Sequence, residues 1–592
     1  MSHDHSGPRR FSVWAPGRRR VRLRIHDGDR DMEPGAGGWW YIDVPDAPHG
    51  TDYAYLLDED PVWLPDPRSR WQPDGVHGAS RVYDHAAFSW TDSHWTGRAL
   101  PGSVLYELHV GTFTPEGTFD AAADRLDHLV DLGVDLVELL PVNAFDGVRG
   151  WGYDGVLWGA VHEPYGGPDG LKRLVDACHG RGLGVVLDAV YNHLGPSGAY
   201  LPRYGPYITG ENTWGPSVNL DGPGSDEVRA YVIDNAVEWL RDYHLDGLRL
   251  DAVHALRDTR AVHLLTELSE EVDALAAGLR RPLSLIAESD RNDARTVTPR
   301  EAGGYHMTAQ WSDDLHHALH VALTGERQGY YADFGPPDAL PRTLRRVFLH
   351  DGGYSAFRGR AHGAPVDRRT IPGSRFLGYL QNHDQVGNRA RGDRISATVS
   401  PDAQVCGAAL VLCSPYTPML FMGEEWAAST PWQFFASFAD PELAEGVRQG
   451  RRREFAEHGW DTDANTAAEA VPDPLDPATR DRSVLRWHER YRSPHREVLE
   501  AYRSLIALRR ARPELADPRL HRFRVDAADD GRVLVLHRGA LRVVCNLRPL
   551  PAAAVLDRPA GAVLLASKEV STGGTVVELP AESFAVVATG TD

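Results

Sequence analysis

Four clusters of polar residues follow short apolar runs in the middle of the chain. They are DAVYNH (188–193), GLRLDAVH (247–254), IAES (286–289) and LQNHD (380–384). A single Asp at the end of a strand is commonly a helix cap or a loop hydrogen-bonding residue. Four such clusters on successive strands are poorly explained in that way, because a carboxylate beside apolar residues is costly unless it is paired or used. We therefore interpret them as parts of one catalytic site.

Asp251 and Glu288 stand in different predicted surroundings. Side chains alternate along a strand, so Arg249 is expected beside Asp251, where its positive charge favours the ionised carboxylate that a nucleophile requires. Glu288 follows the apolar residues Leu285 to Ala287 and has no basic neighbour in the sequence. An apolar setting raises a carboxyl pKa, as a general acid needs. The pair therefore predicts a nucleophile, Asp251, and a general acid, Glu288.

The elements that must position these residues are eight short apolar runs between about residues 103 and 425. Helix-like segments separate several of them, and alternating strand and helix signals indicate a parallel sheet. Eight units favour a closed (β/α)8 TIM barrel over an open doubly wound sheet. In such barrels the active site lies at the carboxyl ends of the strands, where all four clusters occur.

Shorter strand patterns flank the predicted barrel. Between residues 10 and 85, alternation such as that of Val21, Leu23 and Ile25 with arginines is typical of half-buried strands. We expect an N-terminal β-sandwich over residues 1–90, the catalytic barrel over 91–512, and a C-terminal β-sandwich over 513–592. The basic amphipathic segment 495–511 is predicted to be the last helix of the barrel layer. The Gly- and Pro-rich segment 194–223 is predicted to be a functional loop.

Composition limits the partners and the location. The chain has 63 basic and 83 acidic residues and a net charge of −20, which opposes nucleic-acid binding. The absence of a long apolar stretch and of an apolar leader predicts a cytoplasmic protein without a membrane span. The four cysteines show no zinc spacing, so buried free thiols are expected. We predict no cofactor and no required metal.

The four clusters resemble, in sequence and in order, the strand-end motifs of the α-amylase superfamily of glycoside hydrolases. The resemblance implies a retaining mechanism in which Asp251 forms a covalent glycosyl intermediate and Glu288 protonates the leaving oxygen. It implies that Asp384 binds sugar hydroxyls and that Arg249 positions Asp251. Retention requires the two catalytic carboxyl groups to lie about 5–5.5 Å apart. Further sugar contacts are implied for Tyr153, His193 and His383 at the cleavage site and for His254 toward the leaving group.

Several other segments resemble one family within this superfamily, the maltooligosyltrehalose trehalohydrolases. They are 212–225, 415–438, 445–460 and 471–487. The resemblance implies cleavage of the α-1,4 bond next to a terminal trehalose, functional pairing with a maltooligosyltrehalose synthase, and a monomer as the favoured state. A branching or debranching enzyme, or a non-catalytic glucan-binding protein, are the alternatives. A compact, bent trehalose needs a shaped wall, for which we expect Trp214, Glu424, Glu425, Trp426 and Trp432.

Overall fold

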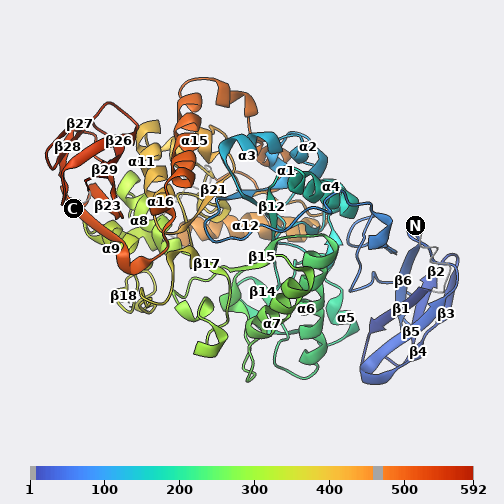
Figure 1. The fold of residues 1–592 in the computed structure, drawn as a ribbon. Helices are drawn as coiled ribbons and strands as arrows, with labels where there is room; N and C mark the ends of the chain where they lie inside the picture. Colours follow the sequence, from blue (N-terminus) through green and yellow to red (C-terminus); the bar gives the residue numbers. More distant parts are fainter. Residues whose placement is uncertain (1–8, 458–470, 591–592) are drawn as a thin grey trace.

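The eight apolar runs form the strands of a closed parallel barrel, which occupies the centre of the molecule (Figure 1). The structure is a computed structural model that describes residues 9–457 and 471–590. The predicted (β/α)8 barrel is confirmed. In spatial order its strands are β8 (Leu105–Leu108), β9 (Leu136–Leu139), β12 (Gly184–Ala189), β15 (Gly247–Leu250), β16 (Ser284–Ala287), β17 (Ala309–Trp311), β20 (Phe376–Tyr379) and β21 (Thr417–Phe421).

The inside of the barrel has an apolar layer and a polar layer. Leu105 and Leu136 pair in register and belong to a buried apolar cluster. Two residues further along the same strands, Glu107 and Glu138 pair in register, and both are 1% exposed. Because side chains alternate along a strand, residues two apart point to the same face. The ionisable groups therefore gather at the carboxyl end of the barrel, above the apolar layer.

Helices surround the barrel, and α15, which ends at Ala511, confirms the predicted amphipathic helix. It packs on α11 and presents Arg509 to the chain that follows α11. The larger helices of this layer are α4 (Gly167–His179), α6 (Ser225–Asp242), α7 (Leu264–Leu279), α8 (Asp313–Thr324), α9 (Ala339–Arg346), α11 (Pro401–Leu412) and α15 (His495–Ala511).

Antiparallel sheets lie on opposite sides of the molecule, with the barrel between them (Figure 1). On the N-terminal side, one sheet joins β1 (Arg9–Trp14), β5 (Trp39–Val44) and β4 (Glu33–Pro34). A second sheet joins β3 (Gly28–Asp31), β2 (Val21–Ile25), β6 (Asp52–Leu57) and β7 (Ser80–Arg81). On the C-terminal side, β22 (Arg524–Ala528), β23 (Val533–Arg538), β24 (Leu541–Asn546), β29 (Ser583–Thr589) and β26 (Ala560–Ala566) form a five-stranded sheet. A second sheet on this side joins β25 (Ala552–Val555), β28 (Val576–Leu579) and β27 (Ser571–Gly573).

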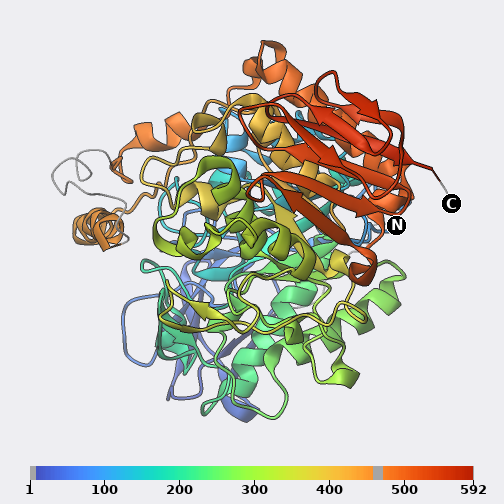
Figure 2. The ribbon, with the colours of Figure 1, turned by 90° about the vertical axis from the view of Figure 1, so that its left-hand side faces the viewer.

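Two excursions from the barrel border the carboxyl ends of its strands. The segment expected to be a loop over 194–223 contains a β-hairpin, β13 (Ile208–Asn212) with β14 (Gly215–Val218). Helix α12 (Pro441–Glu457) follows β21 in the sequence and lies at the left margin of the molecule in Figure 2, where its orange ribbon is seen end-on. Both excursions contribute side chains to the site described below.

The four cysteines, all within the described ranges, are buried and unpaired, as expected. Across residues 9–457 and 471–590, each helix is too short or too polar to cross a membrane.

Arg509 joins α15 to the end of α11 and to the segment that leads to the C-terminal sheets. Its side chain is 3% exposed and donates to the carbonyl groups of Leu412, Ser414, Leu515 and Tyr416 at 2.7–3.1 Å. We expect Arg509→Met to lower the free energy of unfolding by about 2–4 kcal/mol, because these buried carbonyls lose their donors. Calorimetric unfolding should show a reduced Tm. Arg503→Met on the same helix is the control, since its side chain is 34% exposed and its ion pairs are 4.0 Å long. An equal loss in the two variants would contradict the prediction.

Candidate active site

A cavity of about 860 Å³ opens at the carboxyl ends of the barrel strands. It is bounded by barrel residues, by the β13–β14 hairpin and, on another side, by Val447 and Arg451 of α12. Seven of the predicted site residues line this cavity together: Tyr153, His193, Trp214, Asp251, Glu288, His383 and Asp384.

Arg249 lies beneath the cavity floor and contacts three carboxylates. Its Nη1 is 2.7 Å from Asp251 Oδ1 and 2.7 Å from Asp188 Oδ2, and its Nη2 is 3.1 Å from Glu288 Oε2. The guanidinium also lies over the ring of Trp311, 4.2 Å from its centroid. The side chain is completely buried, so a single cation offsets the charge of this carboxylate group and sets the positions of its members.

Glu288 keeps a raised pKa despite its contact with Arg249. Burial raises the pKa of Glu288 well above the usual value. The positive charge of Arg249 lowers this pKa, and the negative charges of Asp251 and Asp384 raise it further. The backbone N–H of Ala252 donates to Glu288 Oε2 at 2.7 Å and orients the carboxyl group. The sequence correctly indicated a buried setting, but it gave no sign of the basic neighbour, which comes from a different strand. A carboxyl group that remains protonated near neutral pH can act as a general acid.

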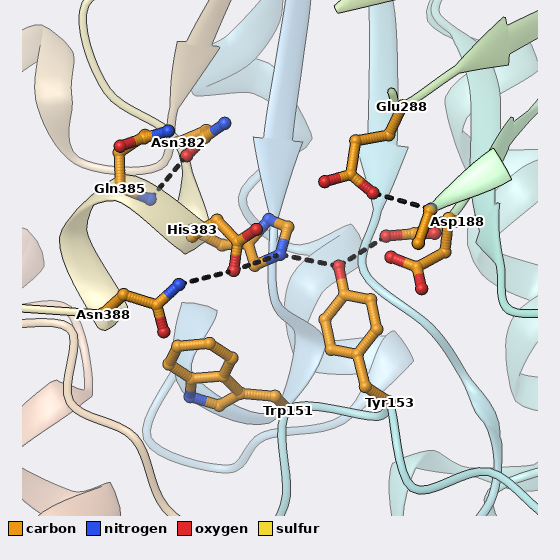
Figure 3. Close-up of polar contacts among 12 residues, drawn as sticks. Trp151, Tyr153, Asp188, Glu288, Asn382, His383, Gln385 and Asn388 are labelled. Carbon is orange, nitrogen blue, oxygen red and sulfur yellow. Dashed lines mark hydrogen bonds and ion pairs between the residues drawn. The ribbon is translucent and has the colours of Figure 1, made fainter. Parts of the chain in front are cut away.

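A chain of hydrogen bonds crosses the floor of the cavity (Figure 3). The hydroxyl of Tyr153 donates to Asp188 Oδ2 at 2.6 Å and lies 2.7 Å from His383 Nε2. On the other side of the imidazole, His383 Nδ1 lies 2.5 Å from Glu107 Oε1. Asp384, the residue after His383 in the sequence, accepts a hydrogen bond from the Asn388 amide at 3.1 Å. The chain connects strands β8, β12 and β20 through side chains of the polar layer.

His193, Trp214 and His254 lie toward the β13–β14 side. His193 Nε2 is 3.0 Å from the carbonyl oxygen of Tyr153, and burial lowers the pKa of His193. Trp214 is 48% exposed and stands on the hairpin, with its ring 5.6 Å from that of His254 in an edge arrangement. His254 therefore contacts the wall-forming Trp214 but does not itself line the cavity.

The expectation for the trehalose wall is corrected at four of its five positions. Glu425 and Trp426 are completely buried, and Glu424 and Trp432 are at most 1% exposed. Glu425 Oε1 accepts from the Tyr106 hydroxyl at 3.1 Å and contacts His128 Nε2 at 2.7 Å. These side chains stabilise the segment after β21 from within and do not line the cavity. Of the expected wall residues, only Trp214 lines it.

Sequence reasoning missed other residues in and below the cavity. They are Trp151, Asn388, Phe434 and Arg451, together with Glu107 below the floor. Glu107 had a visible signal, a carboxylate inside the apolar run LYELHV. Arg451 had none, because its guanidinium reaches the carbonyl of Gly387 only through tertiary packing, and it lies 5.0 Å from the ring centroid of Phe434.

Among residues 9–457 and 471–590, no group of three or more His, Cys, Asp or Glu side chains is arranged to hold a metal ion. Asn192, which follows β12, has its amide oxygen 2.9 Å from His193 Nδ1. The expectation that no metal is required stays a prediction.

Comparison with known proteins gives consistent matches. The model of the α-amylase catalytic domain matches residues 81–205, and a domain of unknown function matches residues 518–586. The malto-oligosyltrehalose trehalohydrolase of Arthrobacter ramosus is 55% identical, over 98% of this chain and 99% of that protein. The Mycobacterium tuberculosis enzyme of the same name is 53% identical over 98% of both chains.

The chain belongs to the malto-oligosyltrehalose trehalohydrolase family. A solved structure from Salmonella typhimurium, of a protein provisionally assigned as an α-amylase, is 37% identical. It superimposes with a TM-score of 0.89 over 99% of this chain and 100% of that one. Membership of this family confirms the resemblance seen in the sequence. Of the four segments that carried it, 445–460 runs past residue 457, so its last residues lie outside the described ranges.

Trp214 and Glu425 should respond oppositely to substitution. Trp214→Ala removes an exposed stacking face from the expected trehalose wall, so we expect trehalose binding to weaken about 3- to 10-fold with no change in Tm. Glu425→Ala leaves Tyr106 and His128 without their buried acceptor, so we expect a stability loss of about 2–4 kcal/mol. Titration with trehalose and thermal unfolding measure the two effects. Weakened binding by a stably folded Glu425→Ala protein would restore its expected sugar contact.

Proposed function

We propose that this protein is a retaining glycoside hydrolase that acts on maltooligosyltrehalose. It cleaves the α-1,4 bond next to the terminal trehalose and releases trehalose and a maltooligosaccharide. The names of its relatives support the substrate. The observation that carries the chemistry is the contact of one buried guanidinium, Arg249, with both Asp251 and Glu288 at the cavity floor.

In the first step, Glu288 donates its proton to the glycosidic oxygen while Asp251 attacks the anomeric carbon. The carbon–oxygen bond to trehalose breaks, and a bond from the anomeric carbon to an Asp251 oxygen forms. In the second step, Glu288 removes a proton from water, which attacks the same carbon and releases the maltooligosaccharide. Asp251 and the protonated Glu288 are then restored. Two displacements at one carbon retain its configuration.

The remaining site residues bind and orient the sugar. Asp384 accepts hydrogen bonds from sugar hydroxyls, and Tyr153 provides a face for the sugar at the cleavage point. His193 and His383 lie on either side of Tyr153, within hydrogen-bonding distance of it. We place trehalose on the side of Trp214 and His254, and the maltooligosyl segment on the side of Phe434 and Arg451.

Several features outside the site belong to the same proposal. The substrate requires a maltooligosyltrehalose synthase as the preceding enzyme, and we propose functional pairing with one. We propose a cytoplasmic monomer and a division of the chain near residues 90 and 512. The N-terminal sheets end at Arg81, before the first boundary, and the C-terminal sheets begin at Arg524, after the second.

Product analysis tests the substrate. We expect maltotriosyltrehalose to yield trehalose and maltotriose rapidly, with slow attack on maltopentaose, because only the first substrate fills the Trp214 side with trehalose. Chromatography of both digests measures this. Random internal cleavage of both substrates, or new branch points, would leave the barrel chemistry in place but reject the trehalose assignment.

Substitution of the general acid tests the mechanism. We expect Glu288→Gln to lower kcat by about 10²–10⁴-fold, because the leaving oxygen is no longer protonated, with glucan binding nearly unchanged. Mass spectrometry with a fluorinated glycosyl substrate should trap an adduct on Asp251, and Asp251→Ala should abolish it. Near-normal turnover of Glu288→Gln, or an adduct on another residue, would overturn these assignments.

A further inference from the structure

His383 contacts the carboxylate of Glu107, which has no role in the mechanism above. Glu107, on β8, is 1% exposed and lies 276 residues away in the sequence. Its Oε2 accepts the backbone N–H of His383 at 2.8 Å, and its Oε1 lies 2.5 Å from Nδ1. One carboxylate therefore holds both the backbone and the ring of His383 at the end of β20.

The hydrogen bonds around the imidazole indicate its protonation state. Nδ1 faces the Glu107 carboxylate, which accepts a hydrogen, so Nδ1 carries one. Nε2 faces the Tyr153 hydroxyl, whose only hydrogen is donated to Asp188. Asp188 is itself held by two contacts of 2.7–2.9 Å from Arg249, as expected of an acceptor. Nε2 must therefore donate to the Tyr153 oxygen, and both ring nitrogens carry hydrogens.

We propose that Glu107 is a positioning residue that holds His383 as a doubly protonated cation beneath the sugar site. The inference rests on the proposed function, because it assigns a role within the same reaction. The cation lies 3.8 Å from Asp384 Oδ1 and, with Arg249, offsets the carboxylates that surround the cavity floor. It also fixes the Tyr153 hydroxyl by donating to it. In the free enzyme, the ring hydrogens of His383 are thus directed to protein groups.

The charged groups around His383 agree with this state. Burial lowers the pKa of His383, but the charges of Glu107 and Asp384 outweigh it and raise the pKa to about 9, with Arg249 opposing them. A histidine with this pKa stays charged at neutral pH. Seven titratable or charged groups in the described part of the chain interact with the ring of His383. They are Glu107 on β8, Glu138 on β9, Tyr153, Asp188 on β12, Arg249 on β15, Asp384 and His109.

The chain provides a matched control at Glu138. It is the register partner of Glu107, is equally buried, and makes no hydrogen bond to His383 in the described structure. Burial, reinforced by the charge of Glu107, raises the pKa of Glu138 well above the usual value. Glu138→Gln therefore makes the same change of side chain at an equally buried position that does not bond to His383, whereas Glu107→Gln removes the carboxylate that faces His383.

The first test compares the pH dependence of kcat on maltotriosyltrehalose. In Glu107→Gln we expect the alkaline limb to move down by at least about one pH unit, toward the ordinary histidine pKa of about 6.5. We expect Glu107→Gln to change kcat more than KM. Glu107→Asp should restore part of the wild-type pH profile, and Glu138→Gln should keep the wild-type alkaline limb. In the protein that combines Glu107→Gln with His383→Gln, the shifted limb should be absent, because no imidazole remains at position 383 to titrate. Equal profiles for Glu107→Gln and Glu138→Gln would overturn the proposal.

The second test does not depend on activity. In wild-type protein labelled with ¹⁵N-histidine, His383 signals, assigned by their loss in His383→Gln, should show imidazolium shifts at a pH of about 7.5. Neutral imidazole shifts would reject the proposed cation. If the wild-type protein releases no trehalose, the proposed function fails, while this spectrum still decides the charge of His383.

Discussion

The placement of Arg249 inside the barrel is the constraint on which the site depends. A guanidinium without exposure to water is stable only when anions and hydrogen-bond acceptors surround it, and Asp188, Asp251 and Glu288 do so from three adjacent strands. The reverse also holds, because these carboxylates would repel one another without a shared cation. The proposed nucleophile and general acid are thus two members of one buried ionic group, and their relative position follows from barrel closure.

The apolar layer beneath this group makes the arrangement effective. Residues such as Leu105 and Leu136 fill the lower barrel, so the polar layer rests on a packed surface of low dielectric constant. Burial in this setting raises the pKa of Glu288 and lets a single positive charge influence several carboxylates. The Glu107–His383–Tyr153–Asp188 hydrogen-bond chain spans the same layer, so short hydrogen bonds join side chains that come from different strands.

The elements that shape the substrate site are separate from the elements that perform the chemistry. Trp214 comes from a hairpin after β12, and Arg451 comes from a helix after β21, on different sides of the same cavity. The residues directly after β21 have another task. Glu425 and Trp426 are completely buried, and the ring centroids of Trp426 and Trp487 lie 5.2 Å apart. Both residues anchor the segment that leads to α12. This division agrees with a barrel whose reaction is conserved in type while its loops select the substrate.

The sequence by itself determined the barrel and the location of its reactive carboxylates. Eight apolar runs indicated eight strands, and the two-residue period of a strand put Arg249 beside Asp251. Only the tertiary structure decided that Arg249 also contacts Glu288, that Glu107 holds His383, and that Glu425 faces the interior. Those contacts depend on which strands become neighbours and on how far each side chain is from water. A local pattern specifies direction along its own strand, but it cannot specify the partner that closure of the barrel brings to it.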